Sequence, residues 1–116
     1  MAINSNQKGK AGEREWVNFL KSQFGIQARR AQQYKGTADS ADVDSQWSFI
    51  HWEVKRVEKL NLQEAMDRAE AESGVKYPVV AHRKNKKKWL VTMRAEDLLK
   101  LSMMIRDSMI ADIPID

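Results

Sequence analysis

The stretch that most constrains the fold lies at residues 50–56, Ile-His-Trp-Glu-Val-Lys-Arg, where apolar and polar side chains alternate. A period of two is typical of a half-buried β-strand. We place this strand at residues 47–57 and expect Glu53 and Lys55 to lie side by side on its polar face. That arrangement suits a divalent metal held by carboxylates, with a lysine beside the metal-bound water. An exposed strand edge carrying a surface ion pair would account for the same residues, and such a pair contributes little to stability.

Length and composition favour one folded domain. The chain has 116 residues, enough for a hydrophobic core, and we see no repeat and no second domain. A hydrophobic fraction of 42% and four tryptophans argue against disorder. We expect a single domain over residues 1–116, with the folded body at about 8–106 and a tail at 107–116.

Charge and residue usage narrow the functional classes. The net charge of +4 favours an anionic partner. The absence of cysteine excludes disulfides, thiolate nucleophiles and cysteine-based zinc sites. No apolar run approaches the length needed to span a bilayer, and the first residues lack the apolar core of a signal peptide. We therefore expect a cytoplasmic protein.

Periodicity and glycine positions predict the other elements. Helical patterns cover residues 10–24, 62–73 and 94–106, the second between the N-cap candidate Asn61 and Gly74. Besides 47–57, strands are expected at 26–31, 41–45, 77–82 and 88–93, with a loop at 32–40 and a basic hairpin turn at 83–88. The order α-β-β-β-α-β-β-α predicts an α/β fold with a mixed sheet flanked by helices.

Glu13 occupies an unusual position in the first predicted helix. Its spacing from Trp16, Val17 and Leu20 places it in the middle of the apolar stripe. A carboxylate aimed at a core is costly unless an arginine or a metal pairs with it. The alternative is that Glu13 lies in the first helical turn, where it favours the helix dipole and reaches water.

Acidic residues from three separate segments can converge at one edge of the predicted sheet. Glu13, Asp42 and Glu53 would hold one or two Mg²⁺ ions, with Mn²⁺ as a substitute. The backbone carbonyl of Val54 would be a further oxygen ligand. Such a metal activates a bound water and neutralises charge on a phosphate under attack. Lys55 would orient or deprotonate that water.

These residues carry a resemblance to a known family. Asp42 followed by Glu53-Val54-Lys55 resembles the PD-(D/E)XK nuclease signature, with Ala41 where the proline of that motif is often found. More specifically, residues 8–15, Lys-Gly-Lys-Ala-Gly-Glu-Arg-Glu, resemble the KGxxxERE opening of archaeal-type Holliday junction resolvases. The likeness spans about residues 8–93, and the segments 32–36 and 55–63 look similar to phage-encoded members of this family.

The resemblance implies a restriction-endonuclease-like fold, dependence on Mg²⁺, and a homodimer that cuts two strands of a four-way DNA junction. It assigns Glu13, Asp42 and Glu53 to the acidic metal site and Lys55 to catalysis. A phage-encoded protein of this kind would act in the host cytoplasm.

Basic residues flank the predicted site and would contact DNA. The resemblance matches Arg14 and Arg30 to arginines of the family's site, and it leaves open whether Thr37 or Ser40 is the hydroxyl residue that precedes the aspartate. An arginine here can grip a phosphodiester through two hydrogen bonds, and Tyr34 can stack on an unpaired base. The residues expected to contact DNA are Lys8, Lys10, Arg14, Arg29, Arg30, Tyr34 and Lys35.

Three functions are compatible with these features. The first is a Mg²⁺-dependent endonuclease that cleaves branched DNA, above all Holliday junctions. The second is a nuclease of the same fold acting on flaps, nicks or duplex DNA. The third is a DNA-binding module without catalysis, which would have no need for acids that repel phosphate. His51 and His82 are interpreted as structural or surface residues rather than ligands, and the basic turn at 83–88 as either a phosphate contact or a solvated loop.

Overall fold

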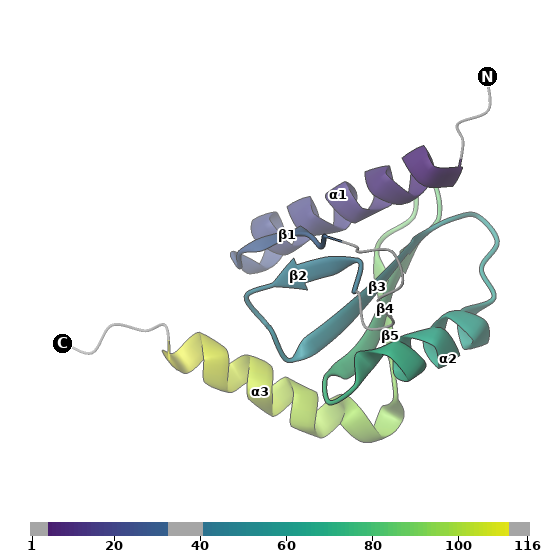
Figure 1. The fold of residues 1–116 in the computed structure, drawn as a ribbon. Helices are drawn as coiled ribbons and strands as arrows, with labels where there is room; N and C mark the ends of the chain where they lie inside the picture. Colours follow the sequence, from purple (N-terminus) through teal and green to yellow (C-terminus); the bar gives the residue numbers. More distant parts are fainter. Residues whose placement is uncertain (1–4, 33–40, 112–116) are drawn as a thin grey trace.

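The computed structural model describes residues 5–32 and 41–111 and has an α/β arrangement (Figure 1). The predicted order α-β-β-β-α-β-β-α is confirmed, with a short 3₁₀ helix before the last helix. The elements are α1 (Ser5–Phe24), β1 (Ala28–Arg30), β2 (Val43–Ser45), β3 (Ile50–Arg56), α2 (Leu62–Ser73), β4 (Tyr77–Arg83), β5 (Leu90–Met93), η1 (Ala95–Asp97) and α3 (Leu98–Ala111).

The strands form one mixed sheet in the order β1-β2-β3-β4-β5. β3 and β4 are parallel, and the other neighbouring pairs are antiparallel. Parallel neighbours need a crossover connection, which α2 supplies between β3 and β4. β3 is therefore the middle strand, so the interpretation of Glu53 and Lys55 as part of an exposed strand edge is wrong.

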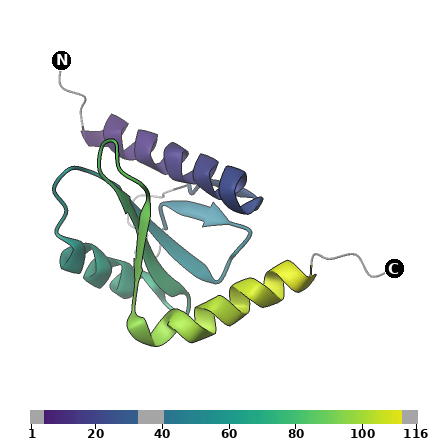
Figure 2. The same cartoon turned by 180° about the vertical axis from the view of Figure 1, so that it is seen from behind.

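Helices lie on both sides of the sheet (Figures 1 and 2). From α1, Trp16 packs edge-on against Trp52 of β3, with ring centroids 5.0 Å apart. From α2, Ala65 and Ala69 pack against Val80 of β4 in a second, smaller core. Because successive side chains of a strand alternate between faces, the two cores occupy opposite faces of the sheet.

Burial on both faces distinguishes β3 from the half-buried strand that its alternating pattern predicts. All residues from Ile50 to Val54 are buried. Trp52 and Val54 belong to the core that includes α1, whereas His51 and Glu53 lie close to Glu72 of α2. The polar face of β3 is thus covered by a helix instead of water.

The ends of several elements differ from their predicted positions. α1 begins at Ser5 instead of residue 10. β3 begins at Ile50 instead of residue 47, because the Ile50 amide donates a hydrogen bond of 3.0 Å to the Trp47 carbonyl and closes a turn there. The predicted bounds of α2 are confirmed, and the Asn61 side chain accepts a 3.1 Å hydrogen bond from the Glu64 amide as its N-cap.

α3 continues to Ala111, into the segment expected to form a tail. It packs on the α1-side core through the buried Leu101 and the partly buried Ile105. Beyond these contacts the helix leads away from the sheet (Figures 1 and 2). Over the described ranges, no helix combines the length and apolar character that crossing a membrane requires.

Candidate active site at the end of the central strand

The site begins where the ladder between β2 and β3 ends. Val43 pairs with Trp52, and the amide of Asp42, the residue just before β2, donates to the Trp52 carbonyl at 2.9 Å. One step further, the Val54 amide donates to the Asp42 carboxylate, with 2.8 Å between Val54 N and Asp42 Oδ2. A side-chain carboxylate thus replaces the backbone partner. Since the N–H and C=O groups of one strand residue point to the same side, the Val54 carbonyl also faces Asp42.

Glu53 is a buried carboxylate in the same stretch of β3. Its side chain is only 5% exposed, and Lys55 Nζ lies 3.8 Å from Glu53 Oε1. Burial and, next in size, the charge of Asp42 together raise the pKa of Glu53 to about 7, against the opposing effect of Lys55. A carboxyl group with this pKa is poorly solvated and close to a second acid, which is the condition that a bound cation relieves.

Glu13 approaches the same acids from α1. Its side chain is 13% exposed, and Arg30 Nε of β1 lies 3.7 Å from Glu13 Oε2. Burial is the main cause that raises the pKa of Glu13, the charge of Asp42 adds to it, and Arg30 opposes it. An arginine therefore accompanies the core-directed carboxylate, one of the two partners that its position in the apolar stripe requires.

Asp42 connects the three acids into one group. Its charge acts on both Glu13 and Glu53, so carboxylates from α1, the start of β2 and β3 share one electrostatic neighbourhood. The buried oxygen Glu13 Oε2 accepts no hydrogen bond from any residue that the structure describes. Carboxylate oxygens with spare lone pairs, together with the Val54 carbonyl, fit the all-oxygen ligand set that Mg²⁺ prefers.

A second set of contacts fixes α1 over this group. Glu15 of α1 pairs with Arg56 of β3, with 3.3 Å between Glu15 Oε2 and Arg56 Nε, and also with Arg83 of β4. Gly12 allows the close approach, because a Cβ placed there would lie 2.6 Å from Arg56 Cβ. The residues before and after Glu13 thus determine where its carboxylate lies.

The structure adds two residues that the sequence interpretation did not place in the site. His51 and Glu72 offer ligand atoms that, together with a carboxylate oxygen of Glu53, all lie within 4.8 Å of one another. The sequence predicts a structural or surface role for His51 and no role for Glu72. A signal for Glu72 is its spacing of three and seven residues from Ala69 and Ala65, the positions of α2 that face the sheet.

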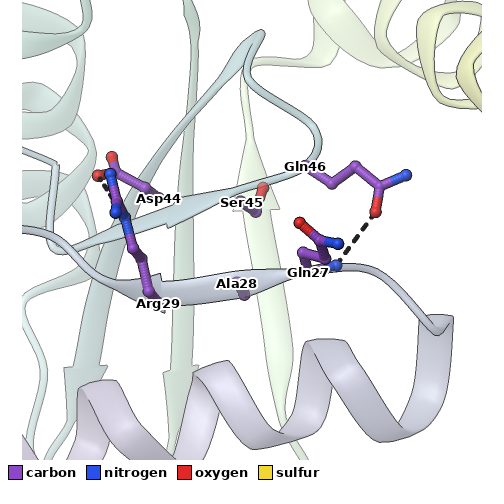
Figure 3. A pocket seen from close by; sticks show the side chains of 6 residues that line it. All are labelled: Gln27, Ala28, Arg29, Asp44, Ser45 and Gln46. Carbon is purple, nitrogen blue, oxygen red and sulfur yellow. Dashed lines mark hydrogen bonds and ion pairs between the residues drawn. The ribbon is translucent and has the colours of Figure 1, made fainter.

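The predicted DNA-contacting residues have different positions. Lys10 and Arg14 are exposed on α1, and Lys10 lowers the pKa of Glu13 by its charge. Arg29, 83% exposed, pairs with Asp44 across β1 and β2 at 3.9 Å, at a hollow over these strands (Figure 3). The hollow is lined by Gln27, Ala28, Arg29, Asp44, Ser45 and Gln46. Tyr34, Lys35, Thr37 and Ser40 lie outside the described residues, as does the side chain of Lys8.

The basic turn at 83–88 belongs to the same end of the sheet as Lys55. β3 and β4 run parallel, with Lys55 opposite His82 and Arg56 opposite Arg83. The turn therefore follows directly from the end of β4 that neighbours the acidic group. His82 itself contacts Thr92, with 3.0 Å between Nε2 and Oγ1, and burial lowers its pKa.

The chemistry that this arrangement allows is hydrolysis assisted by a divalent cation. It combines three carboxylates, a backbone carbonyl, a lysine and surrounding cations at one end of a sheet. Comparison with protein-family models, with curated proteins and with solved structures finds no match to this chain. The function therefore has to be inferred from the residues of the site.

Proposed function

We propose that this protein is a Mg²⁺-dependent DNA endonuclease that hydrolyses phosphodiester bonds in branched DNA, with the four-way Holliday junction as its main substrate. The proposal includes a restriction-endonuclease-like fold and the PD-(D/E)XK arrangement that the sequence resembles. The observation that carries it is the grouping of Glu13, Asp42, Glu53 and Lys55 around the end of β3. Asp42 raises the pKa of both Glu13 and Glu53, and carboxylates with raised pKa values in one neighbourhood are typical of functional sites.

Each residue of the group has a separate task in this proposal. Glu13, Asp42 and Glu53, with the Val54 carbonyl, would hold Mg²⁺. The ion, when bound, supplies an activated water and neutralises charge on the phosphate. Lys55, 3.8 Å from Glu53, would orient the attacking water or take its proton. Arg30, held 3.7 Å from Glu13, would shift from the carboxylate to the phosphodiester as DNA binds.

Cations around the acidic group support a nucleic-acid substrate. Lys10 and Arg14 are exposed on the helix that carries Glu13, and the turn at 83–88 follows β4 at the same end of the sheet. Five of the six residues in that turn are Arg or Lys. Phosphate contacts by such residues give a binding affinity that falls steeply with salt concentration.

Resolution of a junction requires two cuts, and we propose that a second copy of this chain provides the second site. α3 carries an apolar stripe that its own body does not cover, formed by Leu99, Met103 and Ile110, which are 70%, 52% and 50% exposed. Leu99 and Met103 are each two residues from Leu101, so the stripe lies on the opposite side of the helix from the side chain that anchors α3.

The decisive experiment compares cleavage of a synthetic four-way junction with cleavage of matched flap and linear duplex DNA, in Mg²⁺ and in EDTA. We expect paired, symmetric cuts on the junction that require Mg²⁺. The variant Glu53→Gln should abolish cleavage and bind the junction as tightly as the wild type or more tightly, because one negative charge near the phosphate is removed.

Other outcomes would change the proposal in defined ways. Preferential cutting of flaps or duplex would keep the site and replace the substrate. Tight junction binding without cutting of any DNA would make the protein a binding module. Wild-type cleavage by Glu53→Gln would exclude Glu53 from the metal site.

A further inference from the structure

The group formed by His51, Glu53 and Glu72 differs in chemistry from the all-oxygen set around Asp42. It brings one imidazole nitrogen and two carboxylates together, with all three ligand atoms within 4.8 Å of one another. His51 is 1% exposed, and it lies two residues before Glu53 on the same face of β3. Glu72 reaches the pair from α2, the helix that covers this face.

Glu53 has spare capacity toward this group. The Glu53 side chain is only 5% exposed. Among the residues that the structure describes, none donates a hydrogen bond to it. Its ion-pair partner Lys55 lies at 3.8 Å, beyond hydrogen-bond distance. A buried carboxylate is stabilised when its oxygens accept hydrogen bonds or bind a cation. A cation held jointly by His51, Glu53 and Glu72 would supply this stabilisation.

The donor types determine which cation suits this group. Imidazole nitrogen with carboxylate oxygens is a ligand set of Zn²⁺ and related transition-metal ions, commonly with three protein ligands and one open position. Mg²⁺ prefers oxygen ligands throughout. We infer that His51, Glu53 and Glu72 form a second cation site, selective for Zn²⁺-like ions, which shares Glu53 with the proposed Mg²⁺ site.

Sharing one carboxylate makes the two sites compete. The charges of Asp42 and Glu72 both act on Glu53 and raise its pKa. A Zn²⁺ ion on the His51 side draws the Glu53 carboxylate away from the Mg²⁺ ligands. Zn²⁺ is therefore an inhibitor of DNA cleavage; this part rests on the proposed nuclease function, whereas the binding of Zn²⁺ does not.

Within the part of the chain that the structure describes, the ion-pair partner of Glu72 is Arg68. Arg68 Nε lies 3.3 Å from Glu72 Oε1 within α2, and the Arg68 side chain is 64% exposed. Exposed pairs at this spacing are weak, and the second oxygen of Glu72 is not engaged by Arg68. Arg68 thus does not prevent Glu72 from serving as a ligand.

Zn²⁺ binding is measured by calorimetry on the full chain without DNA, in a buffer without Mg²⁺, so that no other divalent ion competes for Glu53. We expect one Zn²⁺ per chain and a dissociation constant that rises at least about tenfold in both Glu72→Gln and His51→Gln. Two matched controls should bind as the wild type does. Glu70→Gln removes an exposed carboxylate from the same helix, and His82→Gln removes the other histidine of the chain.

A further variant tells the two sites apart. Glu13→Gln removes a proposed Mg²⁺ ligand but should leave the Zn²⁺ affinity within about twofold, because Glu13 is carried by α1, which covers the opposite face of the sheet from α2 and Glu72. Weaker binding in Glu13→Gln together with unchanged binding in Glu72→Gln would place Zn²⁺ in the Mg²⁺ site and overturn the inference. Absence of Zn²⁺ binding to the wild type would also overturn it. X-ray absorption of the Zn²⁺ complex should show imidazole nitrogen among the ligands, and an all-oxygen shell would contradict the assignment.

His51 is buried, so the folding of His51→Gln is checked by circular dichroism, and the partly exposed Glu72 carries the test if that variant loses structure. Inhibition is then measured as the Zn²⁺ concentration that halves each variant's own Mg²⁺-supported cleavage rate. Glu72→Gln should raise that concentration at least about tenfold. A wild type that cleaves no DNA would contradict the proposed function, while calorimetry would still test whether the Zn²⁺ site exists. A wild type that cleaves DNA but binds no Zn²⁺ would contradict the Zn²⁺ site and leave the proposed function in place.

Discussion

At the residue scale, the buried Glu53 makes the metal-free protein sensitive to pH. Its pKa is about 7 in the folded protein, against an ordinary value of 4.5 that it regains on unfolding. Between these values the folded state holds the proton more firmly, so the free energy of unfolding falls as pH rises from about 4.5 to 7 and levels off above. The free energy of unfolding falls by roughly 3 kcal/mol in all, because each pKa unit corresponds to about 1.36 kcal/mol.

The variant Glu53→Gln tests this cost. In EDTA, we expect it to be more stable than the wild type at pH 8 and to lose most of this advantage near pH 4.5, where the wild-type carboxyl is protonated in the folded state and half protonated in the unfolded state. Urea denaturation at the two pH values measures the difference. Glu70→Gln, at an exposed position of α2, should show no comparable gain at pH 8. Equal stability of Glu53→Gln and wild type at pH 8 would contradict the burial of a costly charge.

Lys55 tests the chemistry separately from the fold. Its side chain is 32% exposed, so Lys55→Ala should fold normally. The rate of Mg²⁺-supported cleavage should fall at least about 100-fold, as expected for loss of a group that handles a proton. Lys76→Ala is the matched control, because Lys76 is exposed and precedes β4 at the opposite end of the sheet. A single-turnover rate within a few-fold of wild type would remove Lys55 from catalysis.

The residues of the candidate site were predictable to different degrees. Glu53 and Lys55 could be placed together because the strand period alone puts them on one face. The pairing of Glu13 with an arginine followed from the cost of a carboxylate in an apolar stripe. Glu72 could not be paired with His51 from sequence, because that contact depends on the direction in which α2 crosses the sheet.

At the element scale, the position of α1 depends on a glycine. A Cβ at residue 12 would meet Arg56 Cβ at 2.6 Å, and that atom cannot move away without its backbone. Gly12→Ala should therefore displace α1 from β3, with a loss of about 1–3 kcal/mol of stability. Since Glu13 moves with the helix, Mg²⁺-supported cleavage should fall more steeply than the folded fraction.

Gly9→Ala provides the contrast within the same helix. A Cβ at residue 9 would meet no atom within 4 Å, so alanine should keep or raise stability by up to about 1 kcal/mol. Thermal unfolding and single-turnover cleavage of both variants give the comparison. Equal behaviour of the two variants would show that the contact between α1 and β3 has no influence on the site.

The sequence predicts the bounds of a helix or strand more accurately where a capping residue or a glycine marks its end. α2 has the predicted bounds because Asn61 caps one end and Gly74, with φ of 58°, ends the other. β3 is shorter than predicted because Trp47 and Phe49 also alternate with a polar residue, although out of phase with Ile50, and the chain turns before Ile50. α3 is longer than predicted, since its sequence continues to favour a helix after the anchored part ends.

At the scale of the whole molecule, α3 offers the surface for a second copy. Leu99→Glu and Met103→Glu would each place a negative charge in the proposed contact between two copies. Leu99 is 70% exposed and Met103 52% exposed in one chain. We expect light scattering to change from twice 13.4 kDa for the wild type to 13.4 kDa for each variant. Junction cleavage should then produce single nicks instead of paired cuts.

Lys100→Glu controls for the added charge on α3, because Lys100 is exposed but does not belong to the stripe. It should keep the wild-type mass and the paired cuts. A wild type that is monomeric at all concentrations and still makes paired cuts would contradict the role of α3.

The order of helices and strands was predictable from the sequence, whereas the burial of both faces of β3 was not. Alternation in residues 50–56 describes a strand with one apolar face, and it cannot show that a helix covers the polar face as well. The parallel pairing of β3 with β4 supplies this information, because a crossover helix must lie on one side of the sheet. Charge and polarity inside a protein therefore depend on topology that a single strand does not encode.

The hydrogen bond from the Val54 amide to the Asp42 carboxylate has a spectroscopic consequence. It joins a backbone proton to a side chain of the acidic group at 2.8 Å. Amide protons that bind a carboxylate are strongly polarised, so the Val54 resonance in a ¹H–¹⁵N spectrum should lie downfield. A cation that takes charge from Asp42 should move this one resonance upfield while amides on β5 stay in place. Magnetic resonance of a uniformly labelled chain can thus follow occupation of the site without any DNA present.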